Sequence, residues 1–67
     1  MVATVNLTLK QARLISEKKQ KEIASLLGVH IRTYRKIEKN PEIATVKQAK
    51  SISNFLGISY NEIFFGS

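Results

Sequence analysis

The chain has 67 residues, which allows one small domain near the lower size limit for a protein that folds around its own core. It contains no cysteine, which excludes disulfides, thiolate metal sites and a cysteine nucleophile. Eleven lysines and arginines against five acidic residues give a net charge of +6, and such an excess suits a polyanion such as DNA, RNA or an acidic membrane.

The N-terminal residues do not have the pattern of a targeting segment. Residues 1–9 carry no basic group ahead of their apolar residues, so they do not predict a signal peptide. No segment approaches the ~20 apolar residues that span a bilayer. We therefore expect a cytoplasmic protein without membrane contact. Residues 1–6 are expected to form an N-terminal arm, either disordered or extended, ahead of one domain over residues 7–67.

The first predicted helix begins after a capping box. Thr8 and Gln11 have the spacing at which each side chain bonds the backbone of the other, so the helix is expected to begin at Leu9 and to end near Lys18 or Lys19. At helical spacing, the residues expected to face inward are Leu9, Ala12, Ile15 and Ser16.

Residues 20–38 carry the most informative pattern, that of two short helices joined by a tight turn. The second predicted helix covers residues 20–27, and Gly28 closes it at low steric cost. The third covers residues 30–39, and Asn40-Pro41 ends it because the residue before proline avoids the helical region. The expected inward residues are Ile23, Leu26, Leu27, Tyr34 and Ile37. This arrangement predicts a helix-turn-helix, which most often places its second helix in the DNA major groove.

Two more helices complete the prediction of an all-α fold. Thr45 is a cap for a fourth helix over residues 46–56, which Gly57 terminates, and its expected inward residues are Val46, Ala49, Ile52, Phe55 and Leu56. Ser59 and Glu62 have the spacing of a further capping box, which predicts a last short helix over residues 60–65.

Most of the positive charge belongs to the helix-turn-helix. Seven basic and two acidic residues lie from Lys18 to Lys39, so seven minus two gives +5 of the total +6. Arg32 and Lys36 are neighbours on the outer face of the third helix, opposite Tyr34 and Ile37. Arginine and lysine are the residue types that reach guanine O6 and N7 in the major groove. We predict base contacts by Arg32 and Lys36, with Ile31 and His30 at the helix tip; the alternative is a solvated helix face.

The chain resembles the Cro and phage-repressor type of helix-turn-helix domain, the lambda-repressor-like fold. The matching residues are Leu9, Arg13, Gln20, Ile23, Ala24, Leu27, Gly28-Val29, Ile37-Glu38, Leu56-Gly57-Ile58-Ser59 and Glu62-Ile63-Phe64. The resemblance implies a compact five-helix bundle that binds operator DNA as a homodimer and regulates transcription. It also implies an ion pair between Arg13 and Glu38 that ties the first helix to the end of the third.

Phosphate contacts are expected around the start of the second helix. There the Gln20 amide and the backbone N–H groups point at the same anion, as the resemblance also implies. The other candidates for flanking phosphates, each of which could instead be only solvated, are Lys19, Lys21, Arg35, Lys39 and Asn40.

The C-terminal segment predicts self-association. Apolar and aromatic residues crowd positions 58–65, and a bundle of this size is expected to leave part of Tyr60 and the ring of Phe65 exposed. The predicted homodimer interface comprises Tyr60, Phe64 and Phe65, and the alternative is that this segment only closes the core. Such a dimer would place two recognition helices roughly 34 Å apart and read a near-palindrome.

Catalysis is not expected. His30 is the only histidine and has no cysteine partner, so a metal site is not predicted, and we find no nucleophile grouping, phosphate-binding glycine loop or evident small-molecule or cofactor site. The predicted function is a sequence-specific regulator of double-stranded DNA, acting as a repressor. One alternative is a protein-interaction module, such as an antitoxin-like or co-regulator protein with secondary DNA binding; RNA binding is a third option.

Overall fold

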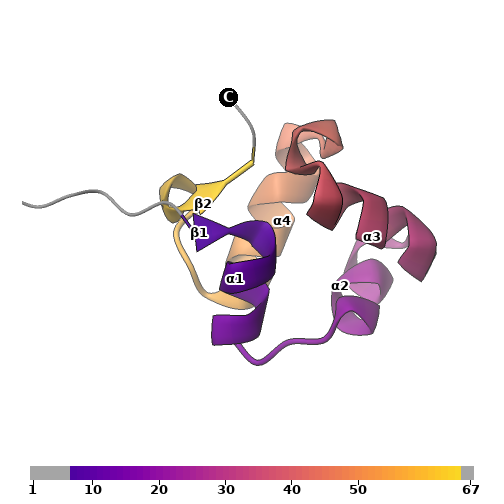
Figure 1. The fold of residues 1–67 in the computed structure, drawn as a ribbon, viewed down its shortest axis with the longest axis horizontal. Helices are drawn as coiled ribbons and strands as arrows, with labels where there is room; N and C mark the ends of the chain where they lie inside the picture. The colour runs from indigo at the N-terminus through magenta and orange to yellow at the C-terminus, as the bar shows by residue number, and fades with distance from the viewer. Residues whose placement is uncertain (1–6, 66–67) are drawn as a thin grey trace, which may run out of the picture.

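The computed structural model describes residues 7–65, so the predicted arm over residues 1–6 lies outside the described part of the chain. Four α-helices follow one another: α1 (Leu9–Ile15), α2 (Gln20–Leu27), α3 (Ile31–Lys39) and α4 (Val46–Leu56). Two-residue strands, β1 (Leu7–Thr8) and β2 (Ile63–Phe64), flank them, and 3₁₀ turns cover Pro41–Ile43 and Tyr60–Glu62 (Figure 1). None of the helices within residues 7–65 is long and apolar enough to cross a membrane.

Local capping explains where two of the helices begin. Thr8 Oγ1 accepts the backbone N–H of Gln11 at 3.1 Å, and Gln11 Oε1 accepts the backbone N–H of Thr8 at 2.9 Å. Thr45 and Gln48 form the same box at the start of α4, with both bonds at 3.0 Å. These boxes satisfy amides that the first helical turn leaves without partners. The predicted caps of α1 and α4 are therefore confirmed.

Helix α1 is shorter than predicted. It ends at Ile15, because Ser16 is the C-cap and Glu17 takes a positive φ of 57° that no continuing helix allows. The prediction that Ile15 faces inward was wrong: the chain turns away, and the side chain is 63% exposed. Ser16 instead donates from its hydroxyl to the backbone oxygen of Leu56 at 2.9 Å, which joins the end of α1 to the end of α4.

The predicted fifth helix over residues 60–65 is also wrong. Ser59 Oγ accepts the backbone N–H of Asn61 at 3.3 Å, but the turn that it caps is a single 3₁₀ turn. The chain then extends, and β2 pairs in parallel with β1, with Leu7 opposite Ile63. Six residues make a marginal helix, whereas β-branched and aromatic residues suit a strand once a partner is present.

The core lies where the four helices meet. Its members with no measurable exposure and the largest volumes are Leu9, Ile23, Tyr34 and Ile52. Besides Ile15, two further residues that were predicted to face inward are exposed. Leu26 lies at the edge of the apolar stripe of α2, which packs toward α3 and α4, and it is exposed. Val46 is the first residue of α4, next to the exposed cap Thr45, and is 62% exposed.

Candidate nucleic-acid interface

The turn between α2 and α3 holds the two helices of the interface together. Gly28 takes a φ of 69°, the left-handed conformation that ends α2, and Val29 donates its backbone N–H to Ala24 at 3.0 Å. His30 then caps α3, because its Nδ1 accepts the backbone N–H of Arg32 at 3.1 Å. His30 therefore lies just before the helix, and in the neutral ring that accepts this bond the proton is on Nε2.

Helix α2 begins without a side-chain cap from Lys19. The lysine ammonium has no acceptor atom, and the structure instead has Glu22 Oε1 accepting the backbone N–H of Lys19 at 2.7 Å. This bond leaves the Lys19 side chain exposed beside the N-terminus of α2. Lys21, the next candidate for a phosphate contact, is also exposed, so both cations remain accessible to an anion.

Helix α3 separates apolar and charged residues onto opposite faces. Tyr34 and Ile37 are buried in the core, whereas the basic residues Arg32, Arg35, Lys36 and Lys39 are all exposed. Glu38 is the only acidic residue of the helix, and its side chain is only 6% exposed. The exposed charges of α3 are therefore all positive.

Glu38 is held by donors from two other helices. Arg13 Nε donates to Glu38 Oε1 at 2.9 Å, and Gln20 Nε2 donates to Glu38 Oε2 at 2.7 Å. Arg13 also donates from Nη1 to the backbone oxygen of Lys18 at 3.1 Å, so it fixes the loop between α1 and α2 as well. The Arg13 side chain is only 10% exposed, so little of its surface is available to contact a ligand.

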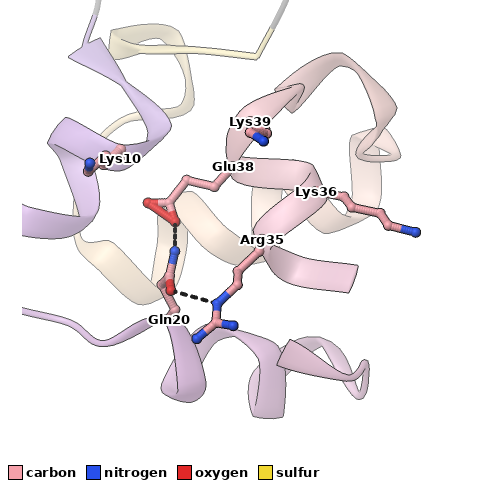
Figure 2. A pocket seen from close by; sticks show the side chains of 6 residues that line it. All are labelled: Lys10, Gln20, Arg35, Lys36, Glu38 and Lys39. Carbon is pink, nitrogen blue, oxygen red and sulfur yellow. Dashed lines mark hydrogen bonds between the residues drawn. The ribbon is translucent and has the colours of Figure 1, made fainter. Parts of the chain in front are cut away.

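The network continues from Gln20 to the outer face of α3. Arg35 Nε donates to Gln20 Oε1 at 3.2 Å, and Figure 2 shows the Gln20 amide lying between Glu38 and Arg35. Arg13, Glu38, Gln20 and Arg35 thus form one chain of hydrogen bonds across α1, α2 and α3. We predicted a phosphate contact for Gln20, and this engagement of both ends of its amide was not visible in the sequence.

A buried hydroxyl lies beside this network. Tyr34 is fully buried, and its hydroxyl has no hydrogen-bond partner among the described residues. Burial raises the pKa of Tyr34 well above its ordinary value, the negative charge of Glu38 adds to the rise, and Arg13 opposes it. The phenol therefore stays neutral at physiological pH, and Tyr34 packs in the core as an uncharged side chain.

A recess of about 410 Å³ opens where α1, α2 and α3 meet, lined by Lys10, Gln20, Arg35, Lys36, Glu38 and Lys39. In Figure 2 Lys36 points away from Gln20, and Lys10 lies on α1, across the recess from α3. Sequence analysis did not identify Lys10, because a single exposed lysine on a first helix carries no local signal. Only the fold brings it beside residues that are 25 or more positions away in the chain.

The remaining predicted residues lie at both ends of the domain. Ile31 is partly buried at the start of α3, and Asn40 is exposed at its end, where its backbone N–H donates to Lys36 at 2.8 Å. At the C-terminal end, the rings of Tyr60 and Phe65 stack with centroids 5.5 Å apart. Phe65 is therefore only partly exposed, less than predicted, because it packs on Tyr60 and against the core.

Comparison with known proteins agrees with this geometry. No curated protein and no solved structure gives a significant match to the chain. The sequence model of a helix-turn-helix family matches residues 9–63, which include all four α-helices. That family is one of DNA-binding regulators and not of enzymes. The chain therefore belongs to the helix-turn-helix family of the Cro and phage-repressor type, whose members are DNA-binding transcriptional regulators.

Proposed function

We propose that the protein is a transcriptional repressor that binds a near-palindromic operator in double-stranded DNA as a homodimer, with α3 in the major groove. The observation that carries this proposal is the charge of α3, whose exposed ionised groups are all positive while its one carboxylate is buried against Arg13 and Gln20. An all-positive face next to a negatively charged groove is favourable whatever the base sequence.

Base recognition falls to the outer face of α3 and to the tip at its N-terminus. Arg32 and Lys36 are exposed on one side of the helix and carry the donors that guanine O6 and N7 accept. His30 is exposed at the tip and its capping bond uses only Nδ1, and Ile31 offers an apolar surface suited to a thymine methyl group. These four residues are proposed to read the half-site.

Backbone contacts surround this reading surface. The proposed phosphate contacts, all exposed, are Lys10, Lys19, Lys21, Arg35, Lys39 and Asn40. They come from α1, from both ends of the α2–α3 unit and from the loop before α2, so they could fix the orientation of α3 in the groove. Lys10 is the addition that the structure suggests.

The proposed dimer forms through the C-terminal segment, with Tyr60, Phe64 and Phe65. The stacked pair of Tyr60 and Phe65 supports this, because Tyr60 leaves more than a third of its surface exposed next to another aromatic ring. A two-fold dimer would place two α3 helices about one DNA turn apart and so match a near-palindrome. Repression then requires only that the dimer occupy DNA that the transcription machinery needs.

Selection from a random pool of double-stranded DNA at near-physiological salt tests the proposal. We expect enrichment of a near-palindrome with half-sites roughly 34 Å apart, and a sedimentation profile of a dimer at binding concentrations. Phe65→Ala should shift that profile toward the monomer. Weak, salt-sensitive binding without any enriched sequence would contradict operator recognition.

A second candidate function is a protein-interaction module with secondary DNA binding. Leu14 and Ile15 favour it, because these adjacent apolar side chains are both more than half exposed at the end of α1. The selection separates the two candidates, since a module of this kind would bind DNA without enriching a sequence. Enrichment of a specific site, together with a change in that site for Arg32→Ala, would contradict the second candidate, in which DNA binding is only secondary.

A further inference from the structure

We propose that Gln20 is a positioning residue for DNA-backbone binding: its carboxamide connects the buried Arg13–Glu38 pair to Arg35 and holds the Arg35 guanidinium ready for a phosphodiester. This inference rests on the proposed function, because the ligand is the DNA backbone. It assigns to Gln20 an action through Arg35, in place of a contact made by its own amide.

The orientation of the Gln20 amide follows from its partners. Glu38 is an ionised carboxylate that can only accept hydrogen bonds, and its Oε1 already receives Arg13 Nε at 2.9 Å. Its Oε2 therefore requires the NH₂ group of Gln20, which it receives at 2.7 Å. The reversed amide would place two oxygens together at one end and an NH₂ group against a guanidinium at the other. Only one orientation is favourable, and it directs Oε1 at Arg35.

The bond to Gln20 leaves the binding edge of Arg35 available. A guanidinium has five N–H donors, and the contact at 3.2 Å uses only the one on Nε. The two Nη groups keep the planar fork that pairs with two oxygens of a phosphate. An exposed arginine otherwise samples many rotamers, so a hydrogen bond that restrains it before binding reduces the entropy lost on binding.

The surroundings of this pair suit an anion. Figure 2 shows Arg35, Gln20 and Glu38 along one line of hydrogen bonds, with Lys10 on the α1 side and Lys39 on the α3 side. Glu38 is the only carboxylate lining the recess, and Arg13 balances its charge. The recess therefore presents net positive charge, which attracts a phosphodiester whatever the base sequence.

A double-mutant cycle tests this role on a mixed-sequence duplex of about 20 base pairs, because backbone contacts do not depend on the operator. Gln20→Met removes both amide hydrogen bonds at similar length and should weaken binding about fivefold in the wild-type background. In the Arg35→Ala background the same substitution should have no further effect. A further fivefold loss there would overturn the proposal, because it would show that Gln20 contacts the phosphate itself.

Arg35→Lys provides the matched control, since it keeps the charge and loses the guanidinium. We expect this variant to keep the salt dependence of the wild type and to show no effect of Gln20→Met. An effect of Gln20→Met in the lysine background as large as in the wild type would contradict an action through the guanidinium.

Hydrogen exchange of the arginine side chains tests the positioning without DNA. The Nε–H of Arg35 should exchange faster in Gln20→Met than in the wild type, while the Nε–H of Arg13 stays slow and shows that the fold is retained. Equal exchange of Arg35 in both proteins would overturn the proposal. Failure of the wild-type protein to bind the duplex would overturn the proposed function, and with it the role of Gln20 in DNA binding. The exchange experiment would still show whether Gln20 restrains Arg35.

Discussion

The two faces of α3 differ in what determines their residues. On the inner face, Tyr34 and Ile37 fill the core and Glu38 accepts bonds from two other helices. On the outer face, Arg32 and Lys36 are exposed and make no hydrogen bond through their side chains among the described residues. The inner face therefore sets stability and the outer face is free to set binding, which explains how one nine-residue helix serves both purposes.

Gln20, from α2, connects the two faces of α3. Glu38 belongs to the inner face and Arg35 to the outer one, and the Gln20 amide contacts both. A change on the inner face could therefore reach the binding surface through this one side chain. Substitutions at the two faces test whether stability and binding are otherwise separate.

The largest effect is expected on the inner face, from Glu38→Ala. This change leaves Arg13 nearly buried without its partner, and breaking such a pair costs about 3 kcal/mol of unfolding free energy. Chemical denaturation measures it, with Glu42→Ala, an exposed glutamate outside the network, as the control that should change stability by less than about 0.5 kcal/mol. We expect the base preference of the folded variant to stay unchanged. An unchanged denaturation midpoint would contradict the structural role of the pair.

Arg32→Ala addresses the outer face and should produce the opposite result. Loss of a bidentate guanine contact is expected to cost about 2 kcal/mol of binding free energy and to relax one position of each half-site. The denaturation midpoint should not fall, because the Arg32 side chain is exposed and only its backbone N–H meets the His30 cap. Lys47→Ala on α4 is the matched control and should leave both quantities unchanged. Equal weakening at every base position would assign Arg32 to the backbone.

Tyr34→Phe tests the inner face by pH. The raised pKa of Tyr34 means that the unfolded chain loses the phenolic proton near 10.0 while the folded protein keeps it. The contribution of Tyr34 to the unfolding free energy is therefore fully present below that pH. It falls above that pH by about 1.4 kcal/mol per pH unit. Phenylalanine should remove this loss and, because the hydroxyl has no partner among the described residues, change stability at neutral pH by less than about 1 kcal/mol. Denaturation at neutral and alkaline pH measures both, and Tyr60→Phe, at an exposed tyrosine, should keep the alkaline loss.

Elements with local signals were predicted well from the sequence. The bounds of α2 and α4 are confirmed at residues 20–27 and 46–56, and α3 begins one residue later than predicted because His30 is its cap. The signals there are glycines in the left-handed conformation, a proline and a capping box, each of which acts within a few residues. The family match over residues 9–63 confirms the resemblance that these elements carried.

Features that depend on distant partners were not predicted. The segment after Ser59 has the spacing of a helix start, but Ile63 and Phe64 pair with a strand 56 positions earlier, and no local pattern reveals that pairing. The site shows the same limit. The charges of α3 were evident from the sequence, whereas the contact of Gln20 with Arg35 and the place of Lys10 depend on how three helices pack.

The smallest expected effect tests how far the binding surface extends beyond α3. Lys10 is exposed on α1 and lines the recess with Arg35 and Lys39, so a phosphate held there would also meet its ammonium group. Lys10→Ala should weaken binding to duplex DNA of any sequence by about 0.5 kcal/mol and lower the slope of affinity against salt by about one. Lys47→Ala is again the control, because Lys47 faces the other end of α2, near Leu27. A salt slope equal to that of the wild type would confine the phosphate contacts to α2, α3 and their loops. The DNA-binding surface would then not extend to α1.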